Sequence, residues 1–290
     1  MLSDILKQNR HLVMHKINFN EDRTIGEVIH SSVQFLKEEG IALLKLYFKF
    51  LFPLFILLAF LTYRSDLLEV SQIINLETDF TDLENLFNGI NLKSIWLVGI
   101  IQAFIWLIFL TVTLIYVKNY HLHSQKTSFR EMWGQLLYEF PKVFILQFFY
   151  LSMIFFGIVS FVIPGIYFGV SFALATTILV FQDTRVFQAM HLSLRLTIKK
   201  WFKTLGYLFI FYLVYLVVRI LLQLPFSMIM NQLIENQEDL NRFAFTILNI
   251  FISVINILSS IFPILGTVYL YFILSQSTPL PHLEESNTRS

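Results

Sequence analysis

The sequence predicts an all-α integral membrane protein whose six transmembrane helices form three hairpins. Of its 290 residues, 56% are hydrophobic and only 14% are charged, whereas a soluble domain carries about 25% charged residues. The chain also contains six separate apolar windows bounded by charged residues. Each window is close to the length of about 20 residues that a helix needs to cross a hydrocarbon core about 30 Å thick.

The six predicted spans follow one another along most of the chain. The first has Lys45 and Lys49 in its opening turns, where long side chains can reach one membrane surface. The third apolar stretch, 143–181, would be about 58 Å long as a single helix, nearly twice the thickness of the hydrocarbon core. It must fold back, and we predict the turn at Pro164-Gly165, because proline lacks a backbone donor and glycine tolerates the bend. The predicted spans are residues 41–63, 95–117, 143–162, 165–182, 205–224 and 246–274.

Prolines also mark the last two spans. Pro225 directly follows the fifth span, which we therefore expect to end at residue 224. The sixth span is longer than one crossing and contains Pro263 and Gly266. A kink, a tilt or a break is expected there.

The charges predict how the chain is oriented. Seventeen of the 21 Lys and Arg residues fall on one side of the predicted spans, and nine of the 20 acidic residues fall on the other. Because Lys and Arg accumulate on the cytoplasmic side, we predict that the N-terminal tail (1–23) and the C-terminal tail (276–290) are cytoplasmic and flank a single membrane domain (24–275). No short apolar segment with a small-residue cleavage site precedes the first span, so we expect a retained anchor in a bacterial inner membrane.

A cytoplasmic amphipathic helix is predicted at the membrane surface before each hairpin. Thr24 to Glu27 and Ser128 to Glu131 have the spacing of a capping box, and the first of these helices is expected to end near Gly40. The third lies within 185–203. The pattern indicates three divergent copies of one unit; alternatively, any loop that approaches a membrane is amphipathic and basic. Five residues of the third helix are predicted to contact lipid headgroups: Arg195, Lys199, Lys200, Trp201 and Lys203.

Small residues stand at four-residue intervals in the fourth span. Gly165, Gly169 and Ala173, which follow Pro164, form a stripe that lets another helix approach closely. We interpret the stripe as a helix-packing surface within the bundle; the alternative is an interface between copies of the chain.

These residues also belong to longer motifs: IPGIYFGV at 163–170, KWFKTLG at 200–206 and RTIGEVI at 23–29. Together they resemble a bacterial group of multi-span proteins related to the membrane domain found beside some glycerophosphoryl diester phosphodiesterases. The resemblance covers nearly the whole chain and implies a membrane fold more than an activity. The chain departs from the group after the last span, where 271–277 lacks the usual charged segment.

No catalytic or metal-binding set is predicted, and no cofactor is expected. The chain has no Cys, and none of the common hydrolase, metalloprotease or nucleotide-binding motifs occurs. His121 and His123 lie two positions apart and do not share a helix face; we interpret them as surface residues. Arg219 is the only ionisable candidate inside a span, either reaching the outer surface or serving as a buried functional charge.

Uncharged polar residues give the one candidate binding site. Four of them recur on one face of the sixth span, and Gln102 and Gln147 are their counterparts in the second and third spans. They form hydrogen bonds between helices, or they form the wall of a polar cavity. The candidate set is Gln102, Gln147, Asn249, Ser253, Asn256 and Ser260.

The sequence therefore predicts a protein without enzymatic activity. We expect a scaffold or accessory subunit of a membrane assembly, whose partners are membrane lipids and other membrane proteins. Nucleic acid is not an expected partner at a pI near 7.9. The alternative is a transporter or lipid-handling protein with an uncharged polar site between helices. A membrane-embedded enzyme would require His121, His123 or the acidic loop after the first span to lie beside another ionisable group.

Overall fold

Long apolar helices make up the fold. The computed structural model describes residues 25–64, 92–122, 128–235 and 242–277, and within these ranges there are helices but no strands. Six helical stretches in the described residues are long and apolar enough to cross a membrane, as in a multi-pass membrane protein. The predicted N-terminal tail, the predicted C-terminal tail beyond Ser277, Thr24, His123 and the acidic segment after the first span lie outside the described residues.

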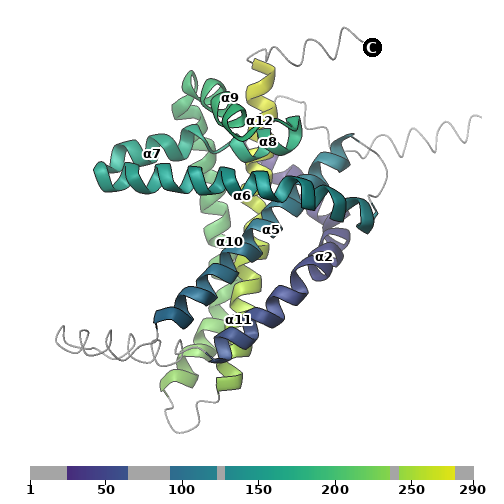
Figure 1. The fold of residues 1–290 in the computed structure, drawn as a ribbon, viewed down its shortest axis with the longest axis vertical. Coiled ribbons are helices and arrows are strands. Elements are labelled where there is room, and N and C mark those ends of the chain that lie inside the picture. Colours follow the sequence, from purple (N-terminus) through teal and green to yellow (C-terminus); the bar gives the residue numbers. More distant parts are fainter. Residues whose placement is uncertain (1–24, 65–91, 123–127, 236–241, 278–290) are drawn as a thin grey trace, which may run out of the picture.

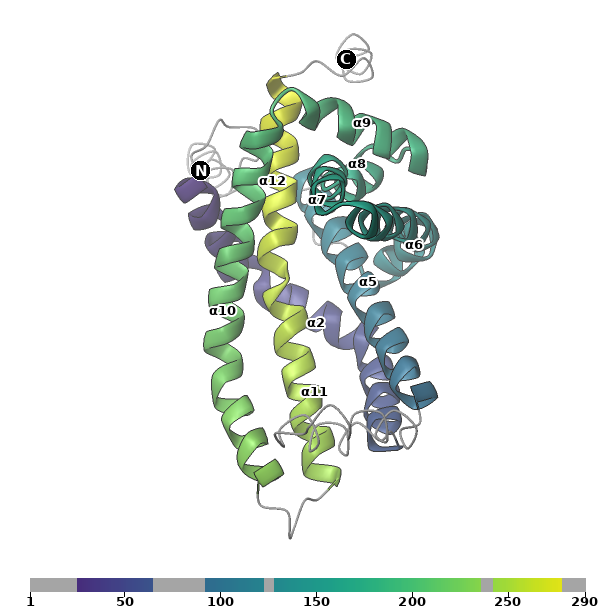
Figure 2. The same ribbon diagram turned by 90° about the vertical axis from the view of Figure 1, so that its left-hand side faces the viewer.

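Helices α10, α11 and α12 run along the longest axis, and α2 and α5 pack beside them (Figures 1 and 2). The hairpin of α6 and α7 instead lies crosswise to this axis. Together with α8 and α9, it occupies the half of the molecule where α12 ends. The helices are α2 (Ile25–Arg64), α5 (Leu92–Leu122), α6 (Phe129–Ser160), α7 (Val162–Ser171), α8 (Ala175–Gln182), α9 (Val186–Ile198), α10 (Trp201–Glu235), α11 (Arg242–Ser259) and α12 (Ile261–Ser277).

The first predicted surface helix is continuous with the first span. Helix α2 runs through Gly40 without a break, so the predicted end near that residue is wrong. A single glycine in a helix costs only about 1 kcal/mol, and the turns on both sides are held by the buried side chains of Phe35 and Leu43. The second surface segment is likewise the first part of α6, where the Ser128 N–H donates to the Glu131 carboxylate at 3.0 Å.

Two of the predictions made from prolines are wrong, and the break expected in the sixth span is confirmed. Helix α10 continues through Pro225 to Glu235, since neighbouring groups in a transmembrane helix can compensate for the hydrogen bond that proline removes. The third predicted span turns at Phe161, three residues before Pro164. The sixth breaks at Ser260, three residues before Pro263. Both prolines are thus the third residue of the new helix, where an N–H has no intrahelical acceptor.

The predicted fourth span is divided into two helices. Helix α7 ends at Ser171 and α8 begins at Ala175, with a turn between them. The Ser171 carbonyl at the end of α7 accepts hydrogen bonds from Ser193 Oγ at 2.8 Å and Thr197 Oγ1 at 3.2 Å, both on α9. Because a free carbonyl is costly in an apolar environment, these two hydroxyls stabilise the interruption.

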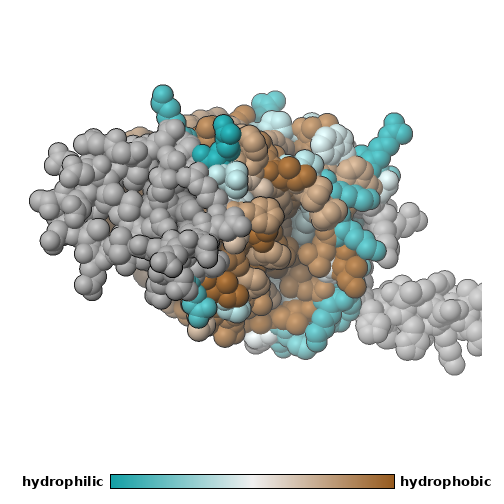
Figure 3. Space-filling view, turned by 90° about the horizontal axis from the view of Figure 1, so that it is seen from below, coloured by the Kyte–Doolittle hydropathy of each residue, from teal (hydrophilic) through white to brown (hydrophobic). Residues whose placement is uncertain are grey.

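Helix α8 is the centre of the core. Its residues from Ala175 to Val180 are all buried, and it contacts α5, α6, α9 and α12. The outer surface is apolar as well. In the space-filling view of Figure 3, hydrophobic residues form most of the face that is not grey, and hydrophilic ones lie mainly towards its edge. An apolar interior with an apolar exterior is the pattern of a helix bundle in lipid.

Candidate functional site

A half-enclosed cavity of about 290 Å³ lies between α5, α6, α10 and the two interrupted helices. Ala173, in the turn between α7 and α8, forms part of its wall, and so do Ser260 and Pro263 at the break between α11 and α12. Both interruptions of the helical backbone therefore face the same space. Non-helical backbone at membrane depth is tolerated where it is buried in protein or lines a cavity.

Uncharged polar groups line one part of the cavity. Gln147 Nε2 donates to Thr176 Oγ1 at 2.9 Å, and Thr177 Oγ1 donates to Thr267 Oγ1 at 3.3 Å. Tyr150 also lines the cavity, and its hydroxyl donates to the Gly169 carbonyl at 2.9 Å. Among the described residues that form the wall, none carries a charge.

Aromatic and aliphatic groups line the remainder of the wall. Trp106, Leu110 and Leu114 come from α5, and Tyr212 and Tyr215 come from α10. Tyr212 is 52% exposed, so it lies at the mouth of the cavity. Helix α10 contacts α7, α9, α11 and α12 but is not closely packed on α5 or α6. The cavity is therefore open between α10 and the α5–α6 side, at Tyr212.

Arg219 lies next to this mouth. Its Nη1 donates to the Tyr215 hydroxyl and its Nε to Gln223 Oε1, each at 3.3 Å. The guanidinium is also 6.0 Å from the centre of the Tyr215 ring. A positive charge is thus coupled to the cavity wall through one tyrosine, although Arg219 does not itself line the cavity.

The six polar residues predicted from the sequence do not converge on one site. Gln147 and Ser260 line the cavity. Gln102 instead donates to Ser253 Oγ at 3.3 Å, between α5 and α11. The Asn249 carbonyl accepts a hydrogen bond from Ser253 Oγ at 2.8 Å, and Asn256 Oδ1 is buried without a partner among the described residues. The break at Ser260 accounts for the difference, because α12 contacts α5 and α8 beside the cavity, whereas α11 packs mainly on α10 and α2.

The three residues of the predicted small-residue stripe and the preceding Pro164 have different surroundings. Gly165 lies against Gly157 of α6. Gly169 accepts the Tyr150 hydrogen bond, Ala173 lines the cavity, and Pro164 is in the first turn of α7. The stripe is therefore not one continuous helix face, because α7 ends before Ala173.

The basic residues predicted to contact lipid headgroups lie near the junction of α9 and α10. Arg195, Lys199 and Lys203 are exposed, and Lys200 is half-buried. Trp201 is half-buried as well, and its ring stacks on Tyr167 of α7, with 6.1 Å between the ring centres. Trp201 thus joins the α9–α10 junction to the α6–α7 hairpin.

A charged cluster that joins the ends of α5 and α8 to the middle of α6 was not predicted. Lys142 Nζ lies 2.6 Å from Asp183 Oδ1 and 3.5 Å from Glu139 Oε2, and Lys118 Nζ donates to the Val180 carbonyl at 2.6 Å. The hydrogen bond from Lys142 lowers the pKa of Asp183. Sequence spacing carries no signal for this cluster because its members come from three helices. It contains only two carboxylates, and no group that could hold a metal ion occurs among the described residues.

Comparison with known proteins does not identify a relative: no family model, curated protein or solved structure matches the chain.

Proposed function

We propose that the protein binds an uncharged or amphipathic molecule, such as a membrane lipid, in the cavity between α5, α6, α8, α10 and α12, and that it is not an enzyme. The observation that carries this proposal is the meeting of two interrupted helices at a half-enclosed cavity with an uncharged wall. This corresponds to the lipid-handling alternative from the sequence, although only two of its polar residues line the cavity.

The composition of the wall supports an amphipathic ligand. Hydroxyl and amide groups on α6, α8 and α12 can orient a polar group, and Trp106 with the leucines of α5 can cover an apolar one. Binding sites usually combine an apolar lining with a few polar groups in this way. Because the wall is uncharged, it is poorly suited to hold a free ion or to couple binding to a proton.

In this proposal the protein is a multi-pass protein of the inner membrane with both termini in the cytoplasm. The half of the molecule that contains Lys199, Lys200 and Lys203 faces the cytoplasm, following the positive-inside rule. The segments before the three hairpins contact the membrane surface there. This orientation makes the charged cluster of Lys118, Glu139, Lys142 and Asp183 part of the cytoplasmic boundary.

Lipid retention tests the proposal. The full chain would be extracted in a mild detergent and examined by native mass spectrometry for bound phospholipid. We expect wild type to retain lipid and Ala173→Phe, which fills the cavity, to lose it. Ala103→Phe is the matched control, because Ala103 is exposed on α5 and does not line the cavity. Equal retention by the two variants, or no lipid on wild type, would contradict the proposal.

A second candidate function is the scaffold or accessory subunit. The observation that favours it is Phe202, which is 82% exposed next to the basic Lys199 and Lys203. Exposed aromatic and basic groups together suit either a protein partner or a membrane interface. Co-purification tests it: a partner protein retained by wild type and lost from Phe202→Ala supports a scaffold, and its retention by both contradicts this role for Phe202.

A further inference from the structure

The hairpin of α6 and α7 differs from the other apolar helices in direction. It lies crosswise to α10, α11 and α12 in both views, and it belongs to the half of the molecule that contains α9 and the end of α12 (Figures 1 and 2). If α10 to α12 cross the bilayer, the hairpin lies largely parallel to the plane of the bilayer. Its turn is then displaced sideways rather than towards the opposite surface.

The length of α7 leads to the same conclusion. This helix has 10 residues, which corresponds to about 15 Å at the α-helical rise. The hydrocarbon core is about 30 Å thick. Helix α8 does not extend α7, since the turn at 172–174 separates them and α8 lies within the core. By itself α7 is therefore only about half as long as the hydrocarbon core is thick, and it cannot cross the membrane alone.

The turn itself is apolar. Phe161, Val162 and Ile163 are 76%, 62% and 79% exposed, and no charged residue occurs between Lys142 and Asp183. A turn at a membrane surface is usually marked by charged residues, Tyr or Trp. The only residue between the two helices, Phe161, donates its N–H to the Gly157 carbonyl at 3.0 Å. This turn is suited to hydrocarbon rather than to headgroups.

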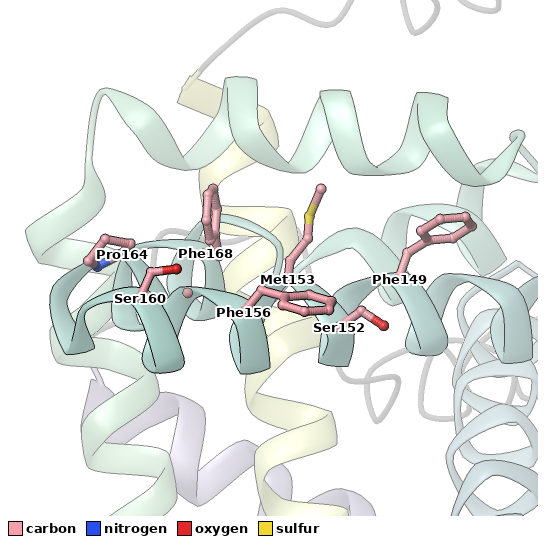
Figure 4. Close-up of a pocket in the computed structure, with 8 residues that line it drawn as sticks. Phe149, Ser152, Met153, Phe156, Ser160, Pro164 and Phe168 are labelled. Carbon is pink, nitrogen blue, oxygen red and sulfur yellow. The ribbon is translucent and has the colours of Figure 1, made fainter.

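A groove in the hairpin adds an apolar contact surface. It has a volume of about 310 Å³ and lies on α6 and α7. Figure 4 shows Phe149, Met153, Phe156 and Phe168 spread along it, with Pro164 near the turn. A long groove lined mainly by aromatic and aliphatic groups fits an acyl chain better than a polar partner.

We infer that the α6–α7 hairpin is re-entrant: it dips into the bilayer from the basic face, turns within the hydrocarbon, and packs against lipid acyl chains without crossing. Lys142 and Asp183, paired at 2.6 Å, mark the position where the chain enters and leaves. The membrane is then crossed by α2, α5, α10 and the α11–α12 pair. Both termini remain on the same side, because a hairpin adds either two crossings or none.

Site-directed spin labelling tests this inference in the full chain, which has no Cys of its own. A nitroxide would be attached at Val162→Cys, with Ser160→Cys as a second probe of the turn. The matched controls are Tyr63→Cys at the end of α2 and Lys199→Cys at the basic end, both exposed. The protein would be placed in nanodiscs of phosphatidylcholine and phosphatidylglycerol, after size-exclusion chromatography has shown that each variant is folded.

We expect the nitroxide at the turn to collide with oxygen but not with a water-soluble nickel chelate, as a group in hydrocarbon does. Both controls should be accessible to nickel. In intact and in permeabilised cells, a membrane-impermeant maleimide should leave Val162→Cys unlabelled from either face, while labelling Tyr63→Cys from one face and Lys199→Cys from the other. Nickel access at Val162, together with labelling from the same face as Tyr63, would show a full crossing and overturn the inference. Neither readout depends on a ligand in the cavity, so it is independent of the proposed function.

Discussion

Gly157 and Gly165 bring the backbones of α6 and α7 into direct contact. A Cβ atom on Gly157 would lie 2.8 Å from both the Cα and the N of Gly165. A Cβ atom on Gly165 would collide with Ile158 Cγ1 and lie 2.9 Å from the Ile158 backbone N. Small residues allow helices in membranes to approach this closely, so these two glycines permit the hairpin to close.

Replacing either glycine with alanine is expected to destabilise the hairpin. The new methyl group meets backbone atoms, which cannot move aside as a flexible side chain can. We expect Gly157→Ala to lower the free energy of unfolding by about 1–3 kcal/mol, the usual range for an overpacked site. Thermal melting in detergent, followed by circular dichroism, would measure the change.

Gly169→Ala on α7, the helix that also contains Gly165, is the matched control. A Cβ there would lie 3.9 Å from Ile154 Cδ1, an ordinary contact distance. Alanine also has a helix propensity better than that of glycine by about 1 kcal/mol, so this variant should be neutral or slightly more stable. Equal melting temperatures for Gly157→Ala and Gly169→Ala would contradict the close approach of the two backbones.

The existence of the hairpin could be predicted from sequence, but its turn could not be placed. A 143–181 stretch without charge is too long for one crossing, and this conclusion needs only the thickness of the bilayer. The exact turn depends on where Gly157 and Gly165 meet, which is a contact between two helices. Pro164 signals a helix start as readily as a helix end, because proline is tolerated in a first turn.

The cavity, too, could be predicted from the sequence only in part. Periodicity placed Asn249, Ser253 and Ser260 on one face, but a face continues only as long as its helix. The break at Ser260 separates α11, which packs on α10 and α2, from α12, which in addition contacts α5, α8 and α9. Thr176, Thr177 and the tyrosines of α10 could not be recognised as wall residues, since their role depends on which helices are adjacent.

The contact between Gly266 of α12 and Phe211 of α10 gives a second prediction. A Cβ on Gly266 would lie 2.6–2.9 Å from three atoms of the Phe211 ring, and this ring is buried. We expect Gly266→Ala to be destabilising by about 1–3 kcal/mol. The loss should be smaller in a Phe211→Leu background, because the colliding ring atoms are absent; a double-mutant cycle of melting experiments measures this coupling.

Gly206→Ala on α10 is the control for helix propensity, since a Cβ there has no atom within 4 Å. It should not destabilise the protein. Additive effects of Gly266→Ala and Phe211→Leu would show that a methyl group at position 266 does not collide with the Phe211 ring.

Two α9 hydroxyls share one acceptor, which predicts non-additive substitutions. Ser193 and Thr197 both donate to the Ser171 carbonyl, and Thr197 Oγ1 also lies 2.9 Å from the Ser193 carbonyl. Ser193→Ala or Thr197→Val alone leaves one donor, so each should have a small effect. The double variant leaves a buried carbonyl unpaired, at a cost of about 1–3 kcal/mol.

Melting of the two single variants and the double variant would measure this effect. The loss in the double variant should exceed the sum of the single losses. Simple additivity would mean that the Ser171 carbonyl finds another donor when both hydroxyls are removed.

The ion pair between Lys142 and Asp183 predicts a dependence of stability on pH. Asp183 ends α8 with a left-handed backbone (φ 48°), and asparagine tolerates this conformation. Asp183→Asn therefore removes the charge without adding backbone strain. Because Asp183 is about half exposed, we expect wild type to be more stable at pH 7 by about 1 kcal/mol or less.

This advantage should disappear in acid. Lys142 lowers the pKa of Asp183 in the folded protein, whereas the unfolded chain has the ordinary value of about 3.9. As the pH falls below the ordinary value, the unfolded chain takes up the proton before the folded protein does. The stability that the ion pair contributes is therefore complete above the ordinary pKa, and it is lost as the pH falls through the lowered pKa of the folded protein. Melting temperatures of wild type and Asp183→Asn should therefore converge as the pH is lowered from 7 through the lowered pKa of Asp183 in the folded protein. A difference that stayed constant over this range would show that the asparagine variant is less stable for a reason other than charge.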